Sequence, residues 1–200
     1  MLSLFAAALA FQATPLPADD AMAARKCAAA VPQLYQSDRL QGSVLIEYFL
    51  FQAADAEGTS GAAFLPRTVE MLNDLDRGSV TADDAERVLG ACVERWPGAF
   101  SEAPVVLPDS AFDRDFLCLG SFILLSASAK ALRNNGLLPP ETPEYQTYLT
   151  RYAELLTPNR METFGDGKGP VELAGEQLKA SIDIGRLDQI AGACIARLED

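Results

Sequence analysis

The sequence contains no histidine in its 200 residues. Histidine is the usual side chain for proton transfer near neutral pH and the commonest metal ligand in proteins. Its absence excludes Ser-His-Asp and Cys-His catalysis, as well as zinc and haem sites that depend on histidine. The sequence also lacks a nucleophile elbow, a dinucleotide-binding fingerprint and a pattern of paired carboxylates. We therefore predict a protein that is not an enzyme, with no catalytic residue, no cofactor and no metal site.

Positive charge and long apolar runs are both scarce. Sixteen Lys and Arg residues stand against 28 Asp and Glu, which gives a net charge of −12. Such a balance repels nucleic-acid phosphate and anionic lipid, so we expect no nucleic-acid partner and no stable membrane insertion of the mature chain. The uncharged stretch 116–129 has fourteen residues, too few for a membrane-spanning helix. We predict that it forms the central, fully buried helix.

The amino-terminal segment has the features of an export signal, except that no Lys or Arg precedes its apolar part. Residues 2–11 read Leu-Ser-Leu-Phe-Ala-Ala-Ala-Leu-Ala-Phe, which is the length of a signal-peptide apolar region. Ala8 and Ala10 form a small-x-small cleavage pattern. We predict that 1–18 is a signal peptide and leader and that the mature protein is periplasmic or secreted. The alternative is an apolar N-terminal helix of a cytosolic protein.

Helical periodicity runs through the chain, whereas the alternating pattern of strands is almost absent. Thr81 followed by Asp84 is typical of a capping box at a helix start, and Gly136 is typical of a helix end. The sequence therefore predicts an all-α helical bundle of about eight helices. Their expected ranges are 19–36, 43–56, 64–76, 82–96, 110–134, 143–156, 170–182 and 187–198.

Two segments near the middle and the end of the chain resemble each other. Residues 88–96 read Val-Leu-Gly-Ala-Cys-Val-Glu-Arg-Trp, and 190–198 read Ile-Ala-Gly-Ala-Cys-Ile-Ala-Arg-Leu. This internal repeat predicts two similar four-helix halves, 19–97 and 110–200, joined by a linker at 98–109. The shared glycines, Gly90 and Gly192, are expected to permit close helix contacts. The alternative is chance similarity between alanine-rich helices.

The four cysteines are expected to form two structural disulfides. No Cys-x-x-Cys pattern occurs, and no histidine is present to complete a zinc site. An exported chain enters an oxidising compartment, where paired cysteines form disulfides. The repeat selects the pairs Cys27–Cys92 and Cys118–Cys194, each joining the first and last helix of one half. If the protein were cytosolic, buried free thiols would be expected instead.

Three short motifs suggest chemistry that their context does not support. The loop 165–169, Gly-Asp-Gly-Lys-Gly, lacks the preceding strand and the Ser or Thr of a phosphate-binding loop, so we expect a connector. The segment 73–78 is similar to the start of a calcium loop, but a loop counted from Asp74 has Ser79 in place of the required Gly and Ala85 in place of the required Glu. Glu47 lies within the apolar run 44–51. It is either an acid with a raised pKa that senses pH, or the solvent-facing stripe of a largely buried helix.

Two arginines occupy matching places in the repeat. Arg95 and Arg197 each follow a cysteine by three residues and share its helix face. Each arginine is a candidate to pair with an acid. We favour the simpler expectation that the side chains extend along the surface with their charges in water.

Three functions fit these features. The leading one is a noncatalytic exported interaction or scaffold protein, acting through helical surfaces on a partner that we expect to be another periplasmic protein. The Ala-Cys pairs at 91–92 and 193–194 make the Cys-bearing helices resemble small acid-stress periplasmic chaperones, which are helical and carry one disulfide between their outer helices. That resemblance implies an acid- or stress-responsive chaperone. The third function is an enzyme with an acid-only site.

Overall fold

The protein is all-α, as the sequence predicts. The computed structural model describes residues 16–138, 145–164 and 167–199, and these residues form helices and loops without a strand. Residues 1–15 of the predicted signal peptide and leader, 1–18, lie outside them. The described helices are α1 (Asp20–Leu34), α2 (Arg39–Ala56), η1 (Gly61–Ala63), α3 (Phe64–Asn73), α4 (Ala82–Arg95), η2 (Pro97–Phe100), α5 (Ala111–Asn134), α6 (Tyr145–Leu155), α7 (Pro158–Phe164), α8 (Pro170–Ile184) and α9 (Leu187–Glu199).

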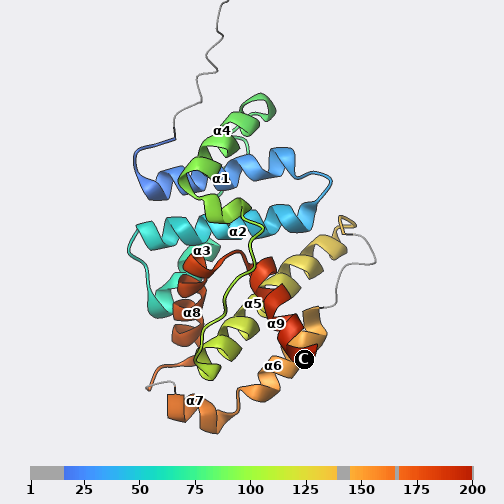
Figure 1. The fold of residues 1–200 in the computed structure, drawn as a ribbon. Coiled ribbons are helices and arrows are strands. Elements are labelled where there is room, and N and C mark those ends of the chain that lie inside the picture. Colours follow the sequence, from blue (N-terminus) through green and yellow to red (C-terminus); the bar gives the residue numbers. More distant parts are fainter. Residues whose placement is uncertain (1–15, 139–144, 165–166, 200) are drawn as a thin grey trace, which may run out of the picture.

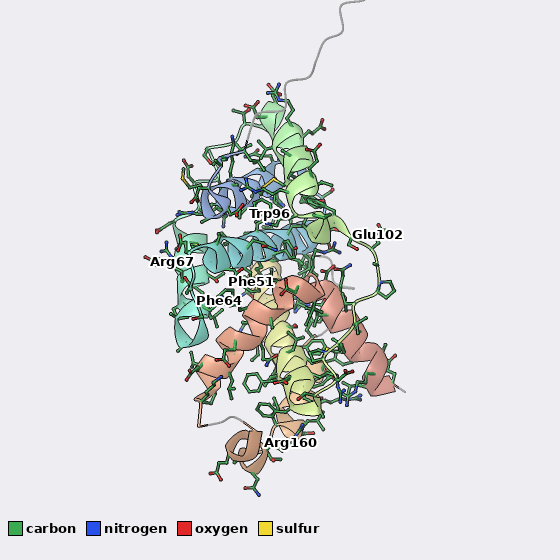
Figure 2. The ribbon with its side chains drawn as sticks, turned by 60° about the vertical axis from the view of Figure 1, so that its left-hand side comes forward. Phe51, Phe64, Arg67, Trp96, Glu102 and Arg160 are labelled. Atoms are coloured by element: carbon green, nitrogen blue, oxygen red, sulfur yellow. A yellow bond between two sulfur atoms is a disulfide. The ribbon has the colours of Figure 1, made fainter. Side chains whose placement is uncertain are left out.

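Helix α2 occupies the middle of the molecule. Figure 1 shows α1 and α4 above it and α5, α8 and α9 below it, and α2 contacts α1, α3, α5, α8 and α9. Contacts on several sides explain why 44–51 is apolar in every direction rather than on one face. Phe51 packs on Phe64 of α3 with ring centroids 5.5 Å apart (Figure 2), and Phe49 packs on Trp96 at 6.0 Å.

The main cluster of buried apolar side chains includes residues from both predicted halves, so the core is continuous between them. The predicted linker 98–109 is packed against α9 and the turn before it. The Arg186 guanidinium donates to the carbonyl oxygens of Ala99 and Ser101 at 2.9 and 3.2 Å. Gln189 Nε2 donates to the Ser101 carbonyl oxygen at 2.6 Å. The division into halves at this segment stays a prediction.

Two disulfides close the chain on itself, with the predicted pairing. Cys27 of α1 is bonded to Cys92 of α4, and Cys118 of α5 is bonded to Cys194 of α9. Each bond therefore joins the first and last helix of one predicted half. The bonded residues are 65 and 76 positions apart in the chain. For loops of this length, the loss of entropy in the unfolded chain stabilises the fold by up to about 4 kcal/mol per bond.

Local signals for helix ends are confirmed at both predicted positions. The Thr81 hydroxyl oxygen accepts the Asp84 N–H at 3.3 Å and donates to the Asp84 carboxylate at 2.8 Å. Gly136 has a φ of 66° after the last turn of α5. There the N–H groups of Gly136 and Leu137 donate to the carbonyls of Arg133 and Leu132, at 3.0 and 2.9 Å. This is the hydrogen-bond pattern of a glycine C-terminal cap.

Helix α5 begins within one residue of the predicted position but is less buried than expected. Among the described residues it alone is long and apolar enough to cross a membrane, by length and composition only. Half of its most apolar stretch is buried inside the structure. The prediction of a fully buried helix is wrong, because Ile123 is 47% exposed on its outer face.

Close backbone approach occurs at a different glycine from those predicted. Gly90 and Gly192 are exposed, and a Cβ added to either would meet nothing within 4 Å. The packing role expected for these two residues is therefore wrong. A Cβ on Gly175 of α8 would lie 2.0 Å from the Gly61 carbonyl oxygen, so this glycine is the one that lets α8 pack against η1.

The two arginines of the repeat form ion pairs with aspartates of the helix to which their neighbouring cysteine is bonded. Arg95 pairs with Asp20 of α1, and Arg197 donates to Asp115 of α5 at 2.9 Å. The expectation that both charges extend into water is wrong. The shared arrangement is what a duplicated unit would produce, but the internal repeat itself stays a prediction.

Candidate functional site

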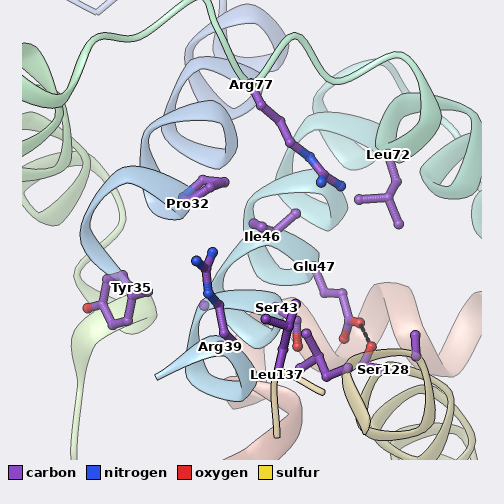
Figure 3. Close-up of a pocket in the computed structure, with 13 residues that line it drawn as sticks. Pro32, Tyr35, Arg39, Ser43, Ile46, Glu47, Leu72, Arg77, Ser128 and Leu137 are labelled. Carbon is purple, nitrogen blue, oxygen red and sulfur yellow. Dashed lines mark hydrogen bonds between the residues drawn. The ribbon is translucent and has the colours of Figure 1, made fainter. Parts of the chain in front are cut away.

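A cavity of about 280 Å³ lies between α1, α2 and α5 (Figure 3). Helix α3 and the segment between α3 and α4 complete its wall. Most of the surface is apolar, and a few polar side chains interrupt it. The lining residues are Pro32, Tyr35, Arg39, Gly42, Ser43, Ile46, Glu47, Leu72, Arg77, Ser128, Ala131, Leu132 and Leu137.

The tight connection between α1 and α2 shapes one wall of the cavity. Helix α1 ends at Leu34 and α2 begins at Arg39, where the Asp38 carboxylate accepts the Gln41 N–H at 3.0 Å. This cap starts α2 four residues before the predicted position 43. A Cβ on Gly42 would lie 2.9 Å from the Tyr35 Cβ, so the absence of a side chain lets the two helix ends come together.

Glu47 brings a carboxyl group into this apolar cavity. Its Oε1 accepts a 2.6 Å hydrogen bond from the Ser128 hydroxyl, while Oε2 is buried and has no hydrogen-bond partner among the described residues. The residue as a whole is only partly buried, so it is the end of the side chain that is shielded from solvent. Burial raises the pKa of Glu47 from 4.5 to about 7, although the Ser128 hydrogen bond lowers it in part. The interpretation of Glu47 as a solvent-facing residue is therefore wrong.

Two arginines reach the same cavity from different elements. Arg39 extends from the first turn of α2, and Arg77 comes from the segment before α4, with its guanidinium toward Ile46 and Leu72 (Figure 3). The Arg77 carbonyl oxygen accepts a 3.1 Å hydrogen bond from Gln33 of α1, which ties this segment to the wall.

Neither arginine of the cavity is neutralised by a residue that the structure describes. Among the described residues neither forms an ion pair, and the buried Arg39 Nε has no hydrogen-bond partner. Among the described residues, Arg39, Arg77 and Glu47 are the only charged ones that line the cavity, so this described lining carries a net positive charge in a strongly acidic protein.

A second polar cluster lies at the opposite end of α5 and holds three helices together. The buried Asp115 carboxylate accepts hydrogen bonds from Arg160 of α7 at 3.0 Å and from Arg197 of α9 at 2.9 Å. The Tyr152 hydroxyl of α6 donates to the Cys194 carbonyl oxygen beside them, at 2.9 Å. Every oxygen of this aspartate is paired, which is the arrangement of a structural ion pair rather than of a reactive acid.

The other motifs of the sequence form ordinary structure. Lys168 binds both carboxylate oxygens of Glu176 at 2.7 Å, and Gly167 has a φ of 78° in the connector before α8, whereas 165 and 166 lie outside the described residues. In the segment 73–78, Asp76 Oδ1 accepts the Gly78 N–H at 3.0 Å. In the described part of the chain no group of three or more His, Cys, Asp or Glu side chains is placed to hold a metal ion.

No protein-family model, curated protein or solved structure matches this chain. The function of the protein is therefore inferred from the geometry of the cavity and from its charges.

Proposed function

We propose that this protein is a noncatalytic exported binding protein that holds a small molecule with an apolar body in the cavity between α1, α2 and α5. One observation carries the proposal: an apolar cavity of about 280 Å³ is lined by two arginines, Arg39 and Arg77, that form no ion pair among the described residues. Ligand sites are typically apolar concavities with a few placed polar groups that orient the ligand.

Export agrees with the disulfides. Two disulfides weakly indicate an oxidising compartment outside the cytosol. Together with the signal-like segment 1–18, they support a periplasmic or secreted location. A binding protein there needs neither a cofactor nor a catalytic group.

The proposal is tested with a neutral ligand and a variant that fills the cavity. Calorimetric titration of octan-1-ol should give saturable binding to one site. Ala131 of α5 lines the cavity and is exposed, so Ala131→Phe should fill it without disturbing the core. Ala127 of the same helix is exposed and does not line the cavity, which makes Ala127→Phe the matched control. Equal loss of octanol binding in both variants would contradict the proposal. It would also be contradicted if neither octanol nor its charged analogues, octanoate and octylamine, bound to the protein.

A second candidate, the acid-responsive chaperone, is favoured by the cluster around Asp115. Loss of the ion pairs at this carboxylate would leave Arg160 and Arg197 without their shared partner and loosen α7 and α9 from α5. Apolar helix faces would then become exposed, which dye binding at pH 3 would detect. Asp115→Asn should bind the dye already at pH 7, whereas Asp109→Asn, at an exposed position, should not. Dye binding by neither variant at pH 7 would count against this candidate.

A further inference from the structure

We infer that the ligand of the cavity is a small amphipathic carboxylate, whose carboxylate group is bound by Arg39 and Arg77 and whose apolar body lies against the leucine and isoleucine side chains of the wall. The inference rests on the proposed function and specifies its ligand class. Four features of the cavity support it: its charge, the shape of its guanidinium groups, its size and an exposed apolar rim.

The charge of the cavity favours an anion. Among the described residues, two guanidinium groups and one carboxyl group line it. The acidic surface lies beyond the cavity, and salt screens its repulsion within about 8 Å under physiological conditions. A ligand inside the cavity therefore meets the local arginine charges rather than the net charge of the protein.

The shape of the guanidinium group indicates which kind of anion binds. Arg39 lines the cavity and forms no ion pair among the described residues, and a guanidinium has donors but no acceptor atom. A carboxylate offers two oxygens in one plane, which match the paired N–H groups of a guanidinium. Arg77 is exposed at the rim and can reach the same group from the other side of Ile46 (Figure 3).

The size and lining of the cavity specify the rest of the ligand. A water-sized unit takes about 30 Å³ in the liquid, so 280 Å³ has room for about nine non-hydrogen atoms. The apolar lining includes Leu72, Leu132 and Leu137, which favours an acyl or aryl chain over a sugar or a bare phosphate. Leu137 is 48% exposed, and a bound chain would cover its exposed surface.

Glu47 makes the binding sensitive to pH. The charged or titratable side chains that share the cavity with it are Arg39 on its own helix, Tyr35 after α1 and Arg77 before α4. The facing residues of α3 and α5, Leu72 and Ser128, do not titrate. Protonated Glu47 leaves only the arginine charges, whereas ionised Glu47 repels a carboxylate. Because the pKa of Glu47 is raised to about 7, a carboxylate ligand should bind more tightly at pH 6 than at pH 8 and with proton uptake.

The test compares three ligands that share one chain and differ in head group. Octanoate, octan-1-ol and octylamine are titrated into the full mature protein by calorimetry at pH 6 and pH 8, below their micelle concentrations. We expect octanoate to bind about tenfold or more tightly than octanol at pH 6, since a charge-assisted hydrogen bond contributes at least that factor. Octylamine should be the weakest of the three.

Charge-removing variants identify the residues that bind the head group. Arg39→Gln and Arg77→Gln should each lower the affinity for octanoate by a larger factor than the affinity for octanol, which brings the two affinities closer together. Arg77 is exposed, so its variant stays informative even if Arg39→Gln fails to fold. Arg151 on α6 is exposed and outside the cavity, so Arg151→Gln removes the same charge and should leave all three affinities unchanged.

The outcomes distinguish a failure of the carboxylate inference from a failure of the proposed function. Equal binding of octanoate and octanol, abolished by Ala131→Phe, would overturn the carboxylate inference and leave the proposed function standing. Tightest binding of octylamine would also overturn it, because Glu47 would then be the anchoring group. Absence of binding by all three ligands would overturn the inference and the proposed function together.

Discussion

The Ser128 hydroxyl of α5 donates a 2.6 Å hydrogen bond to the Glu47 carboxylate of α2, across 81 positions of the chain. The bond joins the two predicted halves at the floor of the cavity. It satisfies only one oxygen of the carboxyl group, and the other stays buried without a partner among the described residues. The stability of the fold therefore depends on whether the carboxyl group of Glu47 is protonated.

Replacing Glu47 should remove one source of the pH dependence of the free energy of unfolding. The pKa of Glu47 is raised to about 7, so its ionisation in the folded state destabilises the fold progressively between about pH 4.5 and pH 7. Glu47→Gln keeps an oxygen for Ser128 without the charge. The variant should gain stability relative to the wild type by at most about 3 kcal/mol between pH 5 and pH 8. Urea unfolding at both pH values measures the free energy of unfolding of the variant and of the wild type. If the difference between the two proteins is the same at pH 5 and at pH 8, Glu47 is not a buried, titrating group.

Removing the Ser128 hydroxyl should affect the ionised carboxyl group most. Ser128→Ala should lower stability at pH 8 by about 1–3 kcal/mol, because the buried Glu47 then loses its hydrogen-bond donor. The loss should be smaller at pH 5, where Glu47 is protonated. Ser126 on the same helix provides the control, since its buried hydroxyl has no hydrogen-bond partner among the described residues. Ser126→Ala should be neutral or stabilising, and equal losses in both variants would contradict a specific Ser128–Glu47 bond.

The two disulfides predict a simple chemical result. Protein purified from an oxidising compartment should contain no titratable thiol, and peptide mapping should link Cys27 to Cys92 and Cys118 to Cys194. Replacing either pair by serine should lower the free energy of unfolding by about 2–4 kcal/mol. A peptide that links Cys92 to Cys194 would contradict the closure of each predicted half by its own bond.

The two arginine–aspartate pairs of the repeat should differ in strength. Asp115 is 3% exposed and serves two arginines, so Asp115→Asn should cost about 2–4 kcal/mol, the loss expected when a buried charge loses its partner. The Asp20 side chain is 63% exposed, so Asp20→Asn should cost less than about 1 kcal/mol. Thermal or urea unfolding measures both, and equal losses would contradict the structural role assigned to Asp115.

Sequence patterns predict the helices and the disulfides because these depend on short-range signals and on four matched cysteines. Thr81 and Gly136 mark helix ends through bonds to residues three to five positions away. The short helix α7 is missed because its few residues lack a strong apolar period. Arg160, which lies in α7, pairs with Asp115 across 45 positions, a contact that no local pattern records.

No sequence pattern predicts the cavity either. It forms where the ends of α1 and α2 meet α5, and its polar groups come from separate elements. Glu47 could be singled out as a charge in an apolar run, yet its partner Ser128 is one of several similar serines in α5. Gly175 lets α8 pack against η1, whereas a Cβ on Gly90 would meet nothing within 4 Å. No sequence pattern distinguishes these two glycines.

Side-chain methyl resonances give the most direct test of the cavity as a ligand site. Octanoate is titrated into methyl-labelled protein at pH 6 while the Ile and Leu signals are followed. If the cavity binds the ligand, the shifts of Ile46, Leu72 and Leu132 should saturate together with a single dissociation constant. Ile123, exposed on the outer face of α5, should not move. Shifts confined to exposed side chains such as Ile123, or shifts that never saturate, would contradict the assignment of a binding site to this cavity.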